Sequence, residues 1–451
     1  MSLKNPRTRS FGGVSLAAAL LVWLVSVQAA EAGRPFPPSG AADCGDRRVE
    51  RPTCPGTRWS PPAHLPGMPP GSGARSPSVA VRGSRGVIVG SNVPVIDESP
   101  LPDRRLAAAT LSGASVPAPG GALGLLHPKA ALDRSGRLHV VWAESDSIPR
   151  TGEEWAFADR RSLWYAVFDG RGWTRPTRLL QGRKLHWGEG YGDVAIDGGD
   201  RLHVVVGGIG ETGFPVFLHA RKDGRGWRIG EVARAQAWYT SLAVRGDDLY
   251  LAYIGAHTAD AGENRVMLTR SADGGASWSR PIPARRAGRA NPTDLTALVG
   301  PDGMLHLVWA ESAPGKLGPE VVLHAASSDQ GASWTEPSTA ALPKDIVGLR
   351  GAVDGCGAVH VVYQSMKFAE APTPGYVSYE FGHLRSEIGY LRWAGGWTEP
   401  ASLFPDYEVS TDAVVFAGPG GGVHLVWSAG KVRGGSEPTF LPMVSTLGPS
   451  R

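Results

Sequence analysis

The 451-residue chain has only three cysteines and, beyond its N-terminus, no apolar segment long enough to span a bilayer. It lacks a Gly-rich phosphate loop, a G-x-S-x-G nucleophile elbow and any strong metal-ligand spacing, so we expect no metal and no cofactor. The chain also lacks a large excess of charge of either sign, because 46 Lys and Arg residues oppose 42 Asp and Glu residues. We therefore expect no nucleic-acid partner.

The N-terminus predicts export. Three cations precede an apolar stretch from Phe11 to Val27, and Ala30-Glu31-Ala32 offers an A-x-A cleavage site. The alternative is a retained membrane anchor, but the stretch is short for a span. We expect a cleaved signal peptide over 1–32, a Pro/Gly-rich linker over 33–78, and a secreted, periplasmic or extracellular monomer without a stable membrane span.

The cysteines suggest one disulfide. Cys44 and Cys54 are close in sequence and follow the signal peptide, so we expect them to pair in an oxidising compartment. Cys356 is then left as a free, partly buried thiol in a turn, or, as the alternative, a nucleophile.

From His127 onward a buried strand recurs. Its six copies are Leu138–Trp142, Leu202–Val206, Leu249–Tyr253, Leu305–Trp309, Val359–Tyr363 and Val423–Trp427. Each copy follows a short turn, and other apolar strands precede and follow it. Four strands per unit and six units predict an all-β, six-bladed β-propeller of antiparallel blades over 79–451. We expect Val87–Val95 or Leu106–Leu111 to complete the last blade, and the recurrent histidines to be structural.

A tryptophan-capped turn of the form S-x-D-x-G-x-x-W is the second repeated element. One copy contains Ser271, Asp273, Gly275 and Trp278, and the other contains Ser327, Asp329, Gly331 and Trp334. Asp accepts backbone N–H groups, Gly adopts positive φ at no steric cost, and Trp buries a large area. This chemistry predicts a tight turn between two strands.

The turn resembles the Asp-box of the sialidase (BNR-repeat) superfamily. The resemblance covers about His127 to the C-terminus and implies a propeller in which the Asp-box is structural and lies away from the ligand. Sialidases of this superfamily use an arginine clamp for the sialic acid carboxylate, a tyrosine nucleophile activated by Glu, and an Asp acid. The resemblance therefore implies Arg350 as the clamp, Tyr239 or Tyr407 as the nucleophile and Glu408 as the base. The acid would be Asp193, Asp294 or Asp412.

The residues that open the inner strands are the candidate ligand contacts. Aligning the six units gives Lys129, Asp193, Ser241, Asp294, Arg350 and Asp412, and two positions earlier His127, Tyr191, Tyr239, Pro292, Gly348 and Ser410. Charges that converge on an axis either satisfy one another and water or contact a ligand. A long loop adds Trp155, an aromatic ring of the kind that stacks on a sugar.

Two functions from different classes remain open. One is a glycan-cleaving enzyme, a glycoside hydrolase of exo-α-sialidase type. The other is a non-catalytic propeller that binds a glycan or a protein through the same residues.

Overall fold

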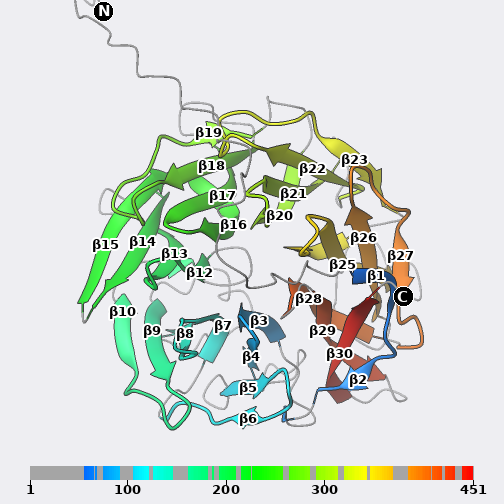
Figure 1. Cartoon of the computed structure of the whole chain (residues 1–451), viewed down its shortest axis with the longest axis horizontal. Coiled ribbons are helices and arrows are strands. Elements are labelled where there is room, and N and C mark those ends of the chain that lie inside the picture. The colour runs from blue at the N-terminus through cyan, green and yellow to red at the C-terminus, as the bar shows by residue number, and fades with distance from the viewer. Residues whose placement is uncertain are drawn as a thin grey trace, which may run out of the picture. The chain divides into compact units, whose positions relative to one another are not determined.

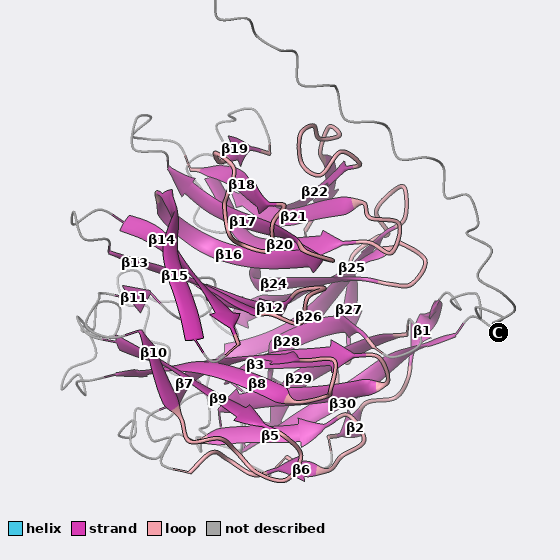
Figure 2. Ribbon diagram, turned by 60° about the vertical axis from the view of Figure 1, so that its left-hand side comes forward, coloured by secondary structure: helices cyan, strands magenta, loops and turns pink. Residues whose placement is uncertain are grey.

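The computed structural model describes residues 55–65, 67–68, 75–91, 105–120, 125–145, 161–180, 185–186, 192–209, 215–224, 226–256, 264–284, 291–312, 319–342, 346–368, 384–407, 409–418, 422–431 and 439–449. All of them lie in one compact unit, Pro52–Arg451. Every regular element within them is a β-strand, as the all-β prediction requires (Figure 2).

Seven strands form an inner ring in which each contacts the next, and the last contacts the first (Figure 1). They are β3 (Arg75–Arg82), β7 (Leu125–Leu132), β12 (Gly192–Ile196), β16 (Gln236–Arg245), β20 (Asn291–Val299), β24 (Ile346–Val353) and β28 (Val409–Ala417). Each one is the innermost strand of a blade, and we number the blades 1 to 7 in this order.

The other strands lie outward of these, antiparallel to their neighbours within each blade. The second strands are β4 (Arg85–Ser91), β8 (Leu138–Ser145), β13 (Leu202–Ile209), β17 (Asp248–Ala256), β21 (Leu305–Ser312), β25 (Val359–Phe368) and β29 (Val423–Lys431). The third strands are β5 (Leu106–Thr110), β9 (Arg161–Phe168), β14 (Pro215–Asp223), β18 (Arg265–Ser271), β22 (Val321–Ser327), β26 (Leu384–Trp393) and β30 (Thr439–Pro449). The outermost strands are β6 (Ser115–Val116), β10 (Thr177–Leu180), β15 (Gly226–Arg234), β19 (Ile282–Pro283), β23 (Ser338–Ala341), β27 (Ala401–Leu403) and β1 (Pro55–Trp59).

The predicted count of six blades is wrong. Five blades are separate sheets, and a nine-stranded sheet contains blades 6 and 7, which join through one parallel bridge between Ser386 and Val409. Within the described residues, one hydrophobic cluster lies between each pair of neighbouring blades, and the seventh lies between blades 7 and 1. The missed unit is blade 1, which has no histidine in its second strand and so does not show the repeat used for counting.

Ring closure also differs from the prediction. The described parts of the segments expected to complete the last blade belong instead to β4 and β5 of blade 1. The strand that closes blade 7 is β1, which pairs with β30 through Pro55 opposite Pro449 and Trp59 opposite Leu447. The short strand β2 (Ala63–His64) pairs with β30 as well. Strands therefore occur inside 33–78, the range expected to be a linker.

The recurrent histidines are structural, as predicted. His139 and His360 each bond a tyrosine of the third strand at 2.8 Å, while His203 and His306 each bond a third-strand histidine, at 3.0 and 2.9 Å. His424 bonds the hydroxyl of Thr446. Each histidine thus satisfies a buried nitrogen within its own blade.

Both tryptophan-capped turns adopt the hydrogen bonding that their chemistry predicts. Asp273 Oδ1 accepts the backbone N–H groups of Ala276 and Ser277, both at 2.9 Å, and Ser271 Oγ accepts that of Gly275 at 2.8 Å. Gly275 and Gly331 have φ of 79° and 92°, which explains the glycine at this position. In the second copy Asp329, Ser327 and Ser333 repeat the bonds. Trp278 and Trp334 pack against clusters between blades.

The disulfide prediction is wrong. Cys356 is disulfide-bonded, and its side chain lies on the surface in the turn between β24 and β25. Because Cys44 and Cys54 are the only other cysteines, one of them is its partner and they cannot pair with each other. Both lie outside the described residues, and Cys356 is not a free thiol.

No helix of the described residues has the length and apolar character needed to cross a membrane.

Candidate site around the ring axis

A β-bulge near the start of most inner strands re-aims the side chains that follow it. The pairing of inner and second strands shifts register at this point in β3, β7, β16, β20, β24 and β28. The bulge residues with positive φ are His127 (45°), Tyr239 (51°), Asp294 (43°), Gly348 (69°) and Asp412 (55°). A positive φ strains any residue other than glycine, and such strain gathers at functional sites. We call these five residues the bulge layer.

Hydrogen bonds between neighbouring inner strands define the next layer. Ser78 Oγ accepts the N–H of Ala130 at 3.0 Å, and Ser241 Oγ accepts that of Ala297 at 3.0 Å. Asp193 Oδ2 does the same for the N–H of Leu242 at 2.8 Å. Each acceptor therefore occupies the same place on its strand. The equivalent positions, which we call the bridging layer, are Ser78, Lys129, Asp193, Ser241, Thr296, Arg350 and Val414.

The two layers correct the sequence alignment. Asp294 and Asp412 were aligned with Lys129, but they are bulge residues equivalent to His127 and Tyr239. Each bulge adds residues to one strand without a partner on the other, so an alignment by apolar pattern slips by two positions here. Pro292 and Ser410, aligned with His127, lie before the bulge residues. Ser78 was missed altogether, because blade 1 was not recognised.

Two cations of the bridging layer act on a carboxylate of the same layer. Burial raises the pKa of the Asp193 carboxyl, and attraction to Lys129 and Arg350 opposes that rise. Asp193 also accepts the N–H of Val194 at 2.9 Å, so its carboxylate is held in place by the backbone. Arg350 Nη1 donates to the carbonyl of Leu349 at 2.9 Å. Strands β7, β12 and β24 thus place two cations and one carboxylate in the same layer of the inner ring, and we call these three residues the axial triad.

The bulge layer adds acceptors and an aromatic ring. Asp294 is buried, and Asp412 Oδ2 accepts the hydroxyl of Thr411 at 3.0 Å. Tyr239 is half-buried and packs against the cluster between blades 4 and 5. Carboxylates bind hydroxyl groups and an aromatic ring stacks on an apolar sugar face, so these side chains suit a carbohydrate.

Tyr407, another predicted site residue, is not brought to these layers. Tyr407 precedes β28 and packs edge-on against Trp427, a buried residue of β29, with the ring centroids 6.4 Å apart. Glu408, Tyr191 and Trp155 lie outside the described residues. Of the predicted nucleophiles, only Tyr239 occupies the bulge layer.

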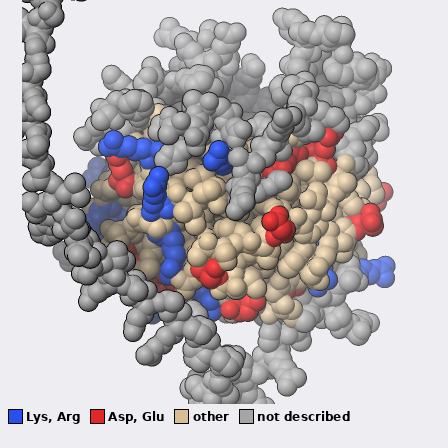
Figure 3. Space-filling view, turned by 90° about the horizontal axis from the view of Figure 1, so that it is seen from above, with Lys and Arg blue, Asp and Glu red and all other residues tan. Residues whose placement is uncertain are grey.

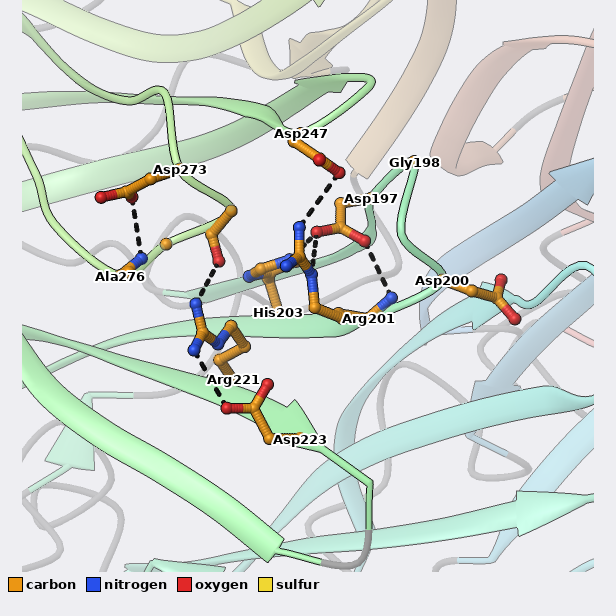
Figure 4. A network of polar contacts seen from close by, with 12 residues as sticks. Asp197, Gly198, Asp200, Arg201, His203, Arg221, Asp223, Asp247, Asp273 and Ala276 are labelled. Atoms are coloured by element: carbon orange, nitrogen blue, oxygen red, sulfur yellow. Dashed lines mark hydrogen bonds and ion pairs between the residues drawn. The ribbon is translucent and has the colours of Figure 1, made fainter.

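The ends of the strands opposite the bulges contain a second polar network (Figure 4). Arg201 donates to Asp197 at 2.6 Å and contacts Asp247 of the next blade at 3.0 Å. Arg221 donates to the carbonyl of Gly274 at 2.8 Å and to Asp223 at 3.0 Å. Because each of these cations already has acidic or carbonyl partners, we interpret this network as a structural connection between neighbouring blades.

Charges of both signs occur on the face that Figure 3 shows, with uncharged surface between them. No cluster of three or more His, Cys, Asp or Glu able to hold a metal ion is found among the residues that the structure describes.

Comparison with known proteins gives the fold. No protein-family model and no curated protein matches the chain. An ulvan lyase, a polysaccharide lyase, is similar in structure with a TM-score of 0.51 and 10% identity, over 85% of this chain and 95% of that one. The same lyase bound to -[GlcA(1-4)Rha3S]- matches equally well. A Hadza microbial sialidase gives 0.45 and 15% over 64% and 62% of the two chains. A Penicillium chrysogenum α-L-arabinanase gives 0.46 and 13% over 72% and 93%. At 10% identity the similarity to the lyase shows a shared β-propeller fold.

Proposed function

We propose that this protein binds an acidic glycan at the axis of its propeller. The observation that carries the proposal is the axial triad, in which Lys129 and Arg350 act on Asp193 from opposite parts of the inner ring. Lysine and arginine both bind anionic groups, and arginine binds a carboxylate through two parallel hydrogen bonds.

The bulge layer supports the same proposal. Asp294 and Asp412 supply acceptors for sugar hydroxyl groups, and Tyr239 supplies a ring and a phenol. The strain at these positions is a cost of roughly 1–3 kcal/mol each, which a purely structural ring has no need to accept. An ulvan lyase with the same fold has been solved with a glucuronate-containing ligand, which is consistent with an acidic sugar as the ligand.

A glycoside hydrolase of sialidase type is the second candidate. It would use Arg350 as the carboxylate clamp, Tyr239 as the nucleophile and Asp193 as the acid. The raised pKa of Asp193 favours this role, because a general acid must hold its proton near neutral pH. Tyr407 does not fit the role of nucleophile, since it packs within the wall between blades 6 and 7. We therefore rank non-catalytic glycan binding above glycoside hydrolysis as the function of this protein.

We also propose that the chain works outside the cytoplasm. A surface disulfide at Cys356 is typical of an oxidising compartment. The cationic and apolar pattern of residues 1–32 supports the same location.

Calorimetric titration with acidic and neutral oligosaccharides tests the binding proposal. Arg350→Met and Lys129→Met should each weaken binding of an oligoglucuronate about 10-fold to 100-fold, the loss expected for one charged hydrogen bond. Arg228→Met, which removes an exposed cation from the outermost strand of blade 3, is the matched control and should bind normally. Equal affinity of the wild-type protein for neutral and acidic sugars would refute the proposal. Turnover of a fluorogenic sialoside, lost in Tyr239→Phe, would establish the hydrolase instead.

A further inference from the structure

The tryptophan-capped turn of one blade contacts the blade before it. In blade 4, Trp278 packs edge-on against His219 of blade 3, with the ring centroids 5.2 Å apart. Gly274 in the same turn lies against Arg201, a residue at the end of the turn between the first two strands of blade 3. The turn before the outermost strand of a blade is therefore beside the turn between the first two strands of its neighbour.

The closing strand of blade 7 repeats this arrangement from the other end of the chain. Trp59 packs edge-on against Tyr390 of blade 6, with the centroids 5.4 Å apart. His219 and Tyr390 are equivalent, because His219 lies opposite Val205 and Tyr390 lies opposite Val362, each two residues after the recurrent histidine. Trp59 thus makes the same edge-on contact from blade 7 to blade 6 as Trp278 makes from blade 4 to blade 3.

The sequence before Trp59 matches the second half of the turn motif. Gly56-Thr57-Arg58-Trp59 has the G-x-x-W spacing of Gly275 to Trp278. Aligning the two tryptophans places Cys54 at the position of Asp273. In blade 4 that position adjoins Gly274, which contacts the turn of the preceding blade.

The turn of blade 6 at the corresponding place contains Cys356. A relay of contacts connects it to Trp59. The ring of Trp59 packs on Tyr390, whose hydroxyl bonds His360 at 2.8 Å, and His360 Nε2 lies 3.0 Å from Asp354 Oδ2. Asp354 Oδ1 in turn accepts the N–H of Cys356 at 2.8 Å. The closing strand and the disulfide-bonded turn are therefore neighbours.

We propose that Cys54 is the disulfide partner of Cys356 and that their bond is a redox-sensitive lock on ring closure. The lock takes the place of the aspartate turn, which blade 7 cannot form as one continuous segment because its third and fourth strands come from opposite ends of the chain. Formation of the S–S bond transfers two electrons and two protons from the thiols to a disulfide oxidant, and a dithiol reductant returns them. Cys44 remains a free thiol.

The lock matters because closure otherwise depends on short strands. Strand β1 has five residues, with an irregular register against β30, and β2 has two. The bond joins residues about 300 positions apart, so it removes a large loop-closure entropy from the unfolded chain. Reduction leaves the N-terminal strand held only by its pairing with β30 and by Trp59. Blade 7, including the bulge residue Asp412, then loses its outer support.

Peptide mapping of the full, non-reduced chain tests the pairing. We expect a linked pair of peptides that contain Cys54 and Cys356, and alkylation of Cys44 alone. A peptide that links Cys44 to Cys356 would overturn the assignment.

Thermal unfolding with and without a dithiol tests the lock. The reductant should lower the Tm of the wild-type chain and of Cys44→Ser by the same amount. Cys54→Ser and Cys356→Ser should each start at the lowered Tm and respond no further. Early proteolytic loss of the N-terminal segment should accompany the lower Tm. An unchanged Tm of the wild-type chain on reduction, with the bond shown to be broken, would refute the lock.

Discussion

Two buried histidine pairs should make this propeller sensitive to acid. His203 and His219 bond at 3.0 Å in blade 3, and His306 and His324 bond at 2.9 Å in blade 5. Burial, with a smaller contribution from the neighbouring histidine, lowers the pKa of His219 and of His324 to about 3. Both side chains are therefore neutral in the folded protein under ordinary conditions.

The sign and size of the effect follow from linkage. The unfolded chain binds a proton at each of these histidines with a pKa of 6.5, and the folded chain binds it only near 3. Stability is therefore fully present above pH 6.5 and falls as the pH drops from 6.5 towards 3. At pH 5 the loss is roughly 2 kcal/mol for each histidine, hence about 4 kcal/mol for the two.

Two other blades of the chain contain, at the equivalent position, a residue that would remove this loss of stability at acidic pH. Tyr165 and Tyr390 occupy the equivalent positions in blades 2 and 6, and each bonds its histidine at 2.8 Å. A tyrosine hydroxyl can form a hydrogen bond with the same neighbouring histidine without binding a proton in this pH range. We expect a variant with both His219→Tyr and His324→Tyr to fold and to be less sensitive to acid than the wild-type chain.

Urea unfolding at pH 7.5 and pH 5 measures the difference. The wild-type chain should lose about 4 kcal/mol more than the double variant between these two values. His64→Tyr, the same change at an exposed residue of β2, is the control and should follow the wild-type chain. An equal loss in the wild-type chain and the double variant would refute the interpretation of these histidines as neutral buried pairs.

Three further predictions concern the tryptophan-capped turns and Tyr407, which lies outside the bulge and bridging layers. Asp329→Ala removes the acceptor for Ser333 and Ser327, and urea unfolding should show a loss of about 1–2 kcal/mol. Gly275→Ala forces a side chain against His219 at positive φ, so it should cost about 2 kcal/mol more than Gly83→Ala, where φ is also positive but no atom lies within 4 Å. Equal costs would contradict the packing described here. Tyr407→Phe should leave glycan affinity unchanged in a calorimetric titration, and a 10-fold loss would return Tyr407 to the site.

The repeat could be predicted from the sequence because the same packing and hydrogen-bonding requirements recur from blade to blade. Each blade buries its second strand on both faces, and each aspartate turn must satisfy the same backbone groups, so Asp273 and Asp329 stand out. The blade count failed where these signals are absent. Blade 1 has no histidine in β4, and the turn of blade 7 is divided between the two ends of the chain.

The site was predicted only in part, for a related reason. Lys129, Asp193 and Arg350 were identified because charged residues open otherwise apolar strands, and all three lie in the bridging layer. Asp294 and Asp412 were assigned to the wrong layer, because a bulge leaves no mark in the apolar pattern. The pairing of Cys356 could not be found from spacing, since its neighbour comes from ring closure and not from nearby sequence.

A crystal structure with an acidic oligosaccharide tests the central claim most directly. We predict a sugar carboxylate within hydrogen-bond distance of Arg350 or Lys129, and sugar hydroxyl groups on Asp294 or Asp412. A ligand bound instead at the far ends of the inner strands, beside Arg201, or on the outer rim would contradict the assignment of the axial triad as the binding site.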